Sequence, residues 1–127
     1  MARILLIDDT PEIAELLSYA LRDRGHEVAA QGFTPDVDDL IVTHGADALV
    51  LDCSVFDMSA SLFDIVRNRP ELSELPIVII SDTPEIADEA LRRREARHVL
   101  LIPKPFTAAH VARALDEMLA PAERPSD

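Results

Sequence analysis

Five short runs of aliphatic residues, separated by polar and amphipathic stretches, constrain the fold of this chain more than any other feature. Each run is nearly uninterrupted Val, Ile, Leu and Ala, without the polar–apolar alternation of a half-exposed strand. Continuous runs of this length are typical of strands in a parallel sheet that is covered on both faces. The runs lie at residues 4–7, 28–30, 48–51, 77–80 and 99–102.

The stretches between the runs carry helix signals. Ile13, Leu17 and Leu21 recur at helical spacing, and Gly25 follows them as a C-terminal stop. The pentad Thr-Pro-Glu-Ile-Ala occurs twice, at residues 10–14 and 83–87. In each copy we expect Thr to cap a helix, Pro to take the first helical position and Glu to lie at the positive end of the helix dipole. The other helices are expected to open at residues 34–36, at Ser59 or at Thr107.

About five strand–helix units in a chain of 127 residues predict an α/β fold, with one open and mostly parallel sheet and helices on both faces. The hydrophobic content of 48% is high enough to build a core for a single compact domain. We assign residues 1–120 to this domain and residues 121–127 to a short flexible C-terminal tail.

The charge of the chain excludes several classes of partner. Its 24 acidic residues against 12 basic ones give a net charge of −12, which repels phosphate backbones and anionic membrane surfaces. We therefore expect no direct nucleic-acid binding and no membrane insertion, and the apolar run at residues 4–7 is too short for a signal-peptide core. The single cysteine leaves no internal disulfide and favours a reducing, cytoplasmic setting.

Polar residues follow four of the five apolar runs. Asp8 and Asp9 follow the first run, Asp52 the third, Ser81 the fourth, and Lys104, the only lysine, lies just after the fifth. Because the carboxyl ends of parallel strands meet at one edge of a sheet, we expect these five side chains to lie together.

This set of side chains indicates phosphoryl chemistry. Carboxylates that lie close together raise one another's pKa unless a cation neutralises them, and oxygen ligands with open positions suit Mg²⁺. With Mg²⁺ in place, a carboxylate oxygen can attack phosphorus and form an aspartyl phosphate. Lys104 then offsets charge on the phosphoryl oxygens, and Ser81 can donate a hydrogen bond to them. A nucleotide-binding enzyme is disfavoured, since no Walker-type glycine loop is present.

In this order and spacing, Asp8-Asp9, Asp52, Ser81 and Lys104-Pro105-Phe106 resemble the response-regulator receiver domains of two-component signalling. The resemblance extends over nearly the whole chain. It implies a five-stranded parallel sheet, doubly wound in the flavodoxin-like strand order 2-1-3-4-5, and a cis peptide bond between Lys104 and Pro105.

The resemblance also implies a role for each site residue. Asp52 would be the phosphoacceptor, and Ser81 and Lys104 would act on its phosphoryl group. Asp9, Asp52 and the backbone carbonyl of Ser54 would hold Mg²⁺ directly, whereas Asp8 would bind the ion through water.

The leading hypothesis is therefore a stand-alone response regulator. It accepts a phosphoryl group from the phosphohistidine of a histidine kinase or phosphotransfer protein onto Asp52, and then switches its binding to a downstream protein target. Such a protein catalyses only its own phosphorylation and dephosphorylation, so it is not an enzyme toward other substrates.

Four positions differ from the family pattern and motivate an alternative hypothesis. Leu101 replaces the usual aromatic switch residue, Phe56 and Ala60 replace Pro and Gly after Asp52, and Asp82 replaces a small residue after Ser81. The alternative is a phosphorylation-independent protein-interaction module on the same fold. On the first hypothesis, the added carboxylate of Asp82 is expected to slow the access of phosphate or to shorten its stay.

The cysteine and the histidines receive structural interpretations. Cys53 directly follows Asp52, so its side chain should point away from the pocket, and a buried structural thiol is expected. The histidines lack metal-ligand spacing, so surface or strand-end positions are expected for His26, His44, His98 and His110.

Overall fold

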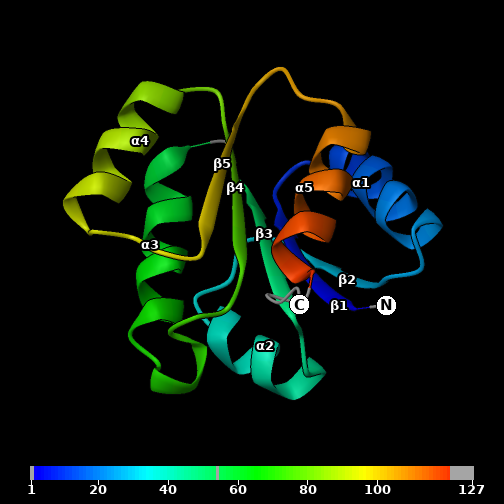
Figure 1. Cartoon of the computed structure of the whole chain (residues 1–127), viewed down its shortest axis with the longest axis horizontal. Coiled ribbons are helices and arrows are strands. Elements are labelled where there is room, and N and C mark those ends of the chain that lie inside the picture. Colours follow the sequence, from blue (N-terminus) through cyan, green and yellow to red (C-terminus); the bar gives the residue numbers. More distant parts are fainter. Residues whose placement is uncertain (1, 54, 121–127) are drawn as a thin grey trace, which may run out of the picture.

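The computed structural model describes residues 2–53 and 55–120, and these form a five-stranded parallel sheet with helices on both faces (Figure 1). The order across the sheet is β2-β1-β3-β4-β5, so the predicted fold class and strand order are confirmed. Each apolar run forms a strand, with bounds β1 (Arg3–Asp8), β2 (Glu27–Gln31), β3 (Ala48–Asp52), β4 (Ile77–Ser81) and β5 (Val99–Pro103).

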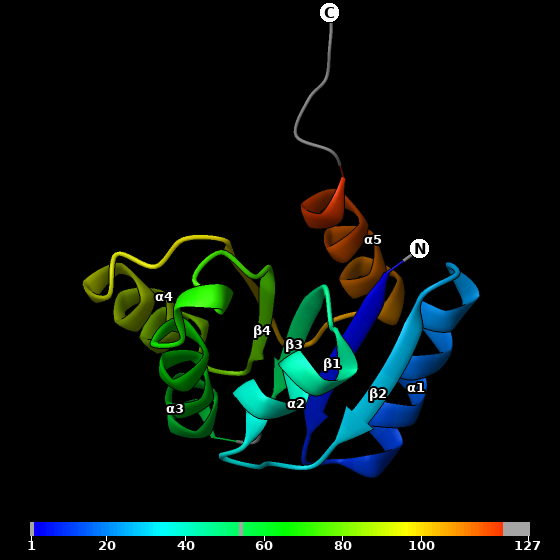
Figure 2. The same ribbon diagram turned by 90° about the horizontal axis from the view of Figure 1, so that it is seen from below.

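Helices cover the two faces of the sheet unequally (Figures 1 and 2). Two helices, α1 (Pro11–Asp23) and α5 (Ala108–Leu119), cover one face. The other face is covered by α2 (Val37–His44), α3 (Phe56–Arg67) and α4 (Pro84–Arg93), with a 3₁₀ turn η1 (Pro70–Leu72) after α3. In the described part of the chain, no helix has the length and apolarity that crossing a membrane requires.

Both faces of the central strands are buried, which explains the unbroken apolar runs. Successive side chains of a strand point to opposite faces. In β1, Leu5 and Ile7 therefore join the core under α2, α3 and α4, whereas Ile4 and Leu6 join the core under α1 and α5. The strands β3 and β4 are buried along their whole length in the same way, and the edge strands β2 and β5 are partly exposed.

One expected helix start and two expected helix caps are wrong. Helix α3 begins at Phe56 rather than at Ser59, because Phe56 packs against the core and draws the helix three residues earlier; Ser59 is buried inside the helix. Thr10 and Thr83 do precede α1 and α4, but neither hydroxyl accepts a capping hydrogen bond. Thr107 caps α5 as predicted, since its hydroxyl accepts from the backbone N–H of His110 at 3.1 Å.

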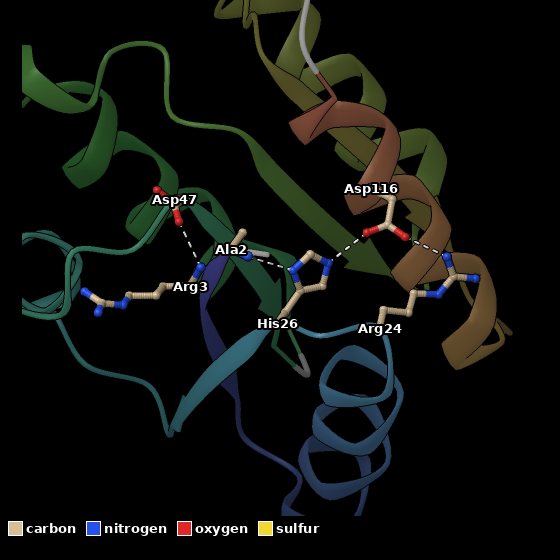
Figure 3. A network of polar contacts seen from close by, with 6 residues as sticks. All are labelled: Ala2, Arg3, Arg24, His26, Asp47 and Asp116. Atoms are coloured by element: carbon tan, nitrogen blue, oxygen red, sulfur yellow. Dashed lines mark hydrogen bonds and ion pairs between the residues drawn. The ribbon is translucent and has the colours of Figure 1, made fainter.

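A polar network joins the amino-terminal edge of the sheet to α5 (Figure 3). His26 Nε2 lies 2.8 Å from Asp116 Oδ1, and His26 Nδ1 accepts from the backbone N–H of Ala2 at 3.1 Å. Arg24 pairs with the other Asp116 oxygen at 2.6 Å. The His26 side chain is only 7% exposed, so a surface position is wrong for it, although it does directly precede β2. The other three histidines are exposed, as expected.

Two expectations fall on residues that the structure does not describe. The predicted tail, residues 121–127, and the predicted metal-binding carbonyl of Ser54 both lie outside the described residues.

Candidate functional site

The carboxyl ends of the strands bring the predicted site residues together. Asp8 and Asp52 are direct neighbours in the register between β1 and β3. Ser81 closes β4, opposite the end of β5, and its backbone carbonyl accepts from the Lys104 N–H at 2.8 Å. The connections that leave β4 and β5 at this edge run across the top of Figure 1. Asp8, Asp52 and Ser81 are buried, whereas Asp9 is exposed.

The only lysine of the chain pairs with the predicted phosphoacceptor. Lys104 Nζ lies 2.9 Å from Asp52 Oδ1, and the ammonium is about one-third exposed while the carboxylate is almost fully buried. The Lys104–Pro105 peptide bond is cis, as the resemblance implies. Burial by itself would lower the pKa of Lys104, but the hydrogen bond and charge of Asp52 outweigh it and raise that pKa. The lysine is therefore a fixed positive charge at the mouth of the site.

The two copies of the pentad place Asp8 and Ser81 in matching turns. Asp8 Oδ1 accepts from the backbone N–H of Thr10 at 2.8 Å, and Ser81 Oγ accepts from the backbone N–H of Thr83 at 3.0 Å. In both cases a polar side chain at a strand end accepts from the residue two positions on, which is an Asx- or Ser/Thr-type turn. These hydrogen bonds satisfy the backbone N–H of each Thr and hold the side chains of Asp8 and Ser81 in place.

Two buried carboxylate oxygens lack a hydrogen-bond donor among the described residues. They are Asp8 Oδ2 and Asp52 Oδ2, one on each of two neighbouring strands. The pKa of Asp8 is raised to about 6, mainly by burial; the charges of Asp52 and Asp9 add to this rise and the hydrogen bond from Thr10 opposes it. Burial also raises the pKa of Asp52, although the hydrogen bond and charge of Lys104 oppose this rise. A buried carboxylate pair with one ammonium lacks positive charge.

These residues fit a hard divalent cation. Asp8, Asp9 and Asp52 carry three negative charges against the single positive charge of Lys104, and two of the buried oxygens have no donor among the described residues. The described residues contain no group of three His, Cys, Asp or Glu side chains arranged to hold a metal. Mg²⁺ does not require such a group, because it binds through one or two carboxylates and keeps waters and phosphate oxygens in its other positions. The site thus suits Mg²⁺ better than a metal that needs a closed protein cage.

A surface pocket of about 540 Å³ opens onto Asp52. Its apolar wall includes Ile13 and Leu16 of α1 and Phe106 of the loop after β5. The charged residues that line it are Asp52, Lys104 and Asp82. Ile13 and Leu16 were not predicted as site residues, because apolar residues at helical spacing in this segment are typical of a helix face that packs on the core. Leu16 is in fact 51% exposed.

The remaining residues singled out from the sequence lie beside the site. Cys53 is buried in the core under α3, as predicted, and burial raises the pKa of its thiol. Leu101, at the position of the usual aromatic residue, is half-buried and packs against the same core. Thr83 was considered only as a helix cap, yet its hydroxyl lies 3.2 Å from Ser81 Oγ. The repeated pentad was the signal that could have revealed this contact.

Three solved structures that resemble this chain show the breadth of its likeness. The chemotaxis response regulator CheY4 of Vibrio cholerae matches with 22% identity and a TM-score of 0.78, over 94% of this chain and 99% of that one. The receiver domain of the sensor histidine kinase PA1611 from Pseudomonas aeruginosa, which has a magnesium ion coordinated in its active site cleft, matches with 20% identity and a TM-score of 0.75, over 92% and 96%. NtrX from Brucella abortus matches with 32% identity and a TM-score of 0.71, over 93% of this chain but only 26% of that one.

The first two likenesses support the fold alone, because their identity is low. No curated protein sequence matches the chain. The family model for the response regulator receiver domain, however, matches residues 4–116, which is most of the chain. Receiver domains of this family are signalling modules that bind Mg²⁺ and interact with histidine kinases and downstream effectors. The fold, its strand order and this match lead to one conclusion: the chain belongs to the response regulator receiver domain family.

Proposed function

We propose that this chain is a stand-alone receiver that takes a phosphoryl group onto Asp52 in the presence of Mg²⁺ and thereby switches its binding to a partner protein. The observation that carries the proposal is the state of the Asp52 carboxylate. The carboxylate is buried, and one of its oxygens lies 2.9 Å from the Lys104 ammonium. Its other oxygen lacks a donor among the described residues, and Asp8 is the neighbouring residue on β1.

The phosphoryl donor is the phosphohistidine of a histidine kinase or a phosphotransfer protein. An Asp52 oxygen attacks the phosphorus, the P–N bond breaks, and the imidazole nitrogen leaves with the electron pair. Bound Mg²⁺ supplies positive charge to the phosphoryl oxygens, and Asp9, Asp52 and the carbonyl of Ser54 would hold it, with Asp8 binding through water. Lys104 then moves its ammonium from the carboxylate to a phosphoryl oxygen.

Ser81 supports the switching step. Its hydroxyl lies 3.2 Å from the hydroxyl of Thr83, the residue before α4. The same hydroxyl oxygen accepts from the backbone N–H of Thr83 and so stabilises the turn that leads into that helix. Donating to a phosphoryl oxygen requires the hydroxyl to turn away from Thr83, which changes the connection between β4 and α4. The partner surface that responds would therefore include α4.

The alternative, a phosphorylation-independent interaction module, has one supporting observation. Leu101 is an aliphatic residue packed into the core, so the described part of β5 presents no aromatic side chain that could change its orientation with the state of Ser81. Binding of a partner to the unphosphorylated protein and to the phosphorylated protein with equal affinity would favour this alternative.

Intact-protein mass spectrometry tests the proposal. The protein is incubated with a small phosphodonor, with and without Mg²⁺, and one phosphoryl adduct is expected only with Mg²⁺. Asp52→Asn should abolish the adduct, while the matched control Asp57→Asn, an exposed position in the first turn of α3, should keep it. An adduct that persists in Asp52→Asn would contradict the proposal. The assay suits this chain because it has no tryptophan to report on the site.

The cytoplasmic location, the domain bounds of 1–120 and the absence of direct nucleic-acid binding remain part of this proposal. The location follows from the single cysteine, the exclusion of nucleic acid from the net charge of −12, and the domain bounds from the extent of the strand–helix units.

A further inference from the structure

Asp82 contributes a second carboxylate to the pocket that opens onto Asp52. It directly follows Ser81, it is exposed, and it lines the same pocket as Asp52 and Lys104. Its charge acts on the Lys104 ammonium through space. The Asp82 side chain has no hydrogen bond or ion pair with any other described residue.

The surroundings of Asp82 strengthen the effect of its charge. The rest of the lining is largely apolar, with Ile13, Leu16 and Phe106, and charges beside low-dielectric walls are screened less than charges in open water. The Lys104 ammonium is already paired with Asp52 at 2.9 Å. Among the described lining residues, Asp82 is therefore the negative charge that has no partner of its own.

We propose that Asp82 is a specificity-determining residue that repels small, doubly negative phosphodonors from Asp52 and so favours a phosphoryl group carried on nitrogen by a docked protein. This inference rests on the proposed function and names its substrate class. The apolar wall of the pocket offers a docking protein a contact that a small free anion cannot use. Repulsion from Asp82 therefore acts fully on the free anion, whereas for a docked donor the apolar contact between the two proteins offsets it.

Two small donors separate the effect of charge from other effects. Acetyl phosphate is a dianion at neutral pH, and its transfer breaks the P–O bond to the acetyl group, with acetate leaving with the electron pair. Phosphoramidate has a protonated nitrogen and a net charge near −1, and its transfer breaks the P–N bond, with ammonia as the leaving group. Because Coulomb energy scales with the product of the charges, Asp82 should disfavour acetyl phosphate more strongly.

The experiment measures second-order rate constants of labelling by intact-protein mass spectrometry with saturating Mg²⁺. The variants are Asp82→Asn, which removes the charge at nearly constant shape, and Asp82→Ala, which also removes bulk. The matched control is Glu85→Gln, an exposed acid in the first turn of α4 that does not line the pocket. Thermal denaturation checks that every variant folds.

We expect Asp82→Asn to accelerate labelling by acetyl phosphate on the order of tenfold at low salt, and labelling by phosphoramidate by clearly less. The gain should shrink as salt rises, because the Debye length falls from about 10 Å at 0.1 M to about 3 Å at 1 M. Glu85→Gln should change neither rate. Labelling by acetyl phosphate in Asp82→Asn but not in the wild type would be the strongest form of the expected result.

Four outcomes would overturn the inference. Equal gains for the two donors in Asp82→Asn would show that the effect of Asp82 does not depend on the charge of the donor. A gain in Asp82→Ala without one in Asp82→Asn would show that bulk rather than charge limits access. Wild-type labelling that Asp82→Asn does not accelerate beyond Glu85→Gln would remove the inference and leave the proposed function standing. The absence of any Mg²⁺-dependent adduct in all variants would instead overturn the proposed function, and this inference with it.

Discussion

Asp8 is the single residue whose ionisation should couple most strongly to the stability of this protein. Its pKa is raised from 3.8 to about 6, mainly by burial. A carboxyl group with a raised pKa stays protonated in the folded state at pH values where it is ionised in the unfolded state. The stability that this group contributes is therefore greatest at low pH and falls as the pH rises from about 4 to about 6.

The first prediction follows from this sign. In the absence of divalent metal, Asp8→Asn should stabilise the protein relative to the wild type near pH 7, by up to about 3 kcal/mol, and should have little effect near pH 4. Urea denaturation followed by circular dichroism at the two pH values measures the difference. A stabilising effect that is equal at both pH values would show that the ionisation of Asp8 is not its cause.

The sequence predicted which side chains gather at the carboxyl edge of the sheet, but not the contacts that hold them there. Asp8, Asp52, Ser81 and Lys104 were identified because strand ends in a parallel sheet are neighbours, a rule that needs only the strand positions. The burial of His26 was missed, since its partner Asp116 is 90 positions away in the chain. No local pattern carries that information, because the packing of α5 against α1 brings the two together.

At the scale of elements, the strands were predicted from local patterns, whereas a helix start that depends on tertiary packing was not. Strands were predicted well because burial on both faces leaves an unbroken apolar run in the sequence. The start of α3 was misplaced because a capping residue, Ser59, was weighed above the packing of Phe56. Packing of the partly buried Phe56 against the core contributes free energy comparable to that of a cap, and the helix begins at Phe56 with Ser59 buried inside it.

Arg67 connects three elements that are separate in the sequence. From the last turn of α3, its guanidinium donates to the carbonyl of Leu72, the last residue of η1, and to that of Leu75 after η1, each at 2.9 Å. It also donates to the carbonyls of Arg97 and His98 in the turn before β5, at 2.9 and 3.1 Å. Burial lowers the pKa of this guanidinium. Arg67 thus fixes the turn between α4 and β5.

The second prediction concerns this contact. Arg67→Ala should destabilise the protein by about 2–4 kcal/mol, because four backbone carbonyls lose a charged donor. Arg67→Lys should retain only a part of the stability that Arg67→Ala loses, since an ammonium cannot reproduce the planar array of donors. The matched control is Arg92→Ala, which removes only an exposed i,i+4 pair with Asp88 and should cost below about 0.5 kcal/mol. Chemical denaturation of the three variants measures these differences, and equal costs for Arg67→Ala and Arg92→Ala would contradict the assignment.

At the scale of the whole molecule, the two edges of the sheet have different roles. The carboxyl edge gathers carboxylates that lack donors among the described residues, whereas the amino edge holds the closed network of His26, Asp116 and Arg24 (Figure 3). The hydrogen bond from His26 lowers the pKa of Asp116, so this carboxylate is satisfied in its ionised form. The charged groups of the amino edge are paired and contribute to stability, whereas the carboxylates of the carboxyl edge lack compensating positive charge.

The third prediction concerns the amino edge. Asp116→Asn should lower the free energy of unfolding by about 1–2 kcal/mol, because both His26 and Arg24 lose their charged acceptor. It should leave the rate of Mg²⁺-dependent labelling at Asp52 unchanged, since the network lies at the other end of the sheet. Thermal denaturation and intact-protein mass spectrometry on the same sample measure the two quantities. Altered labelling in a variant that still folds would show that the two edges are coupled.

The final prediction separates specific metal binding from the general response of a chain with a net charge of −12. Any salt stabilises such a chain by screening its self-repulsion, so the melting temperature should be compared in Mg²⁺ and in K⁺ at equal ionic strength. A ligand that binds only the native state at about a hundred times its Kd adds about 2.7 kcal/mol, which is a shift of several degrees. We expect this extra shift with Mg²⁺ in the wild type and in Asp57→Asn, but not in Asp9→Asn, although both substitutions remove one charge. An equal Mg²⁺ shift in all three proteins would mean that the ion acts on the total charge rather than at the carboxyl edge of the sheet.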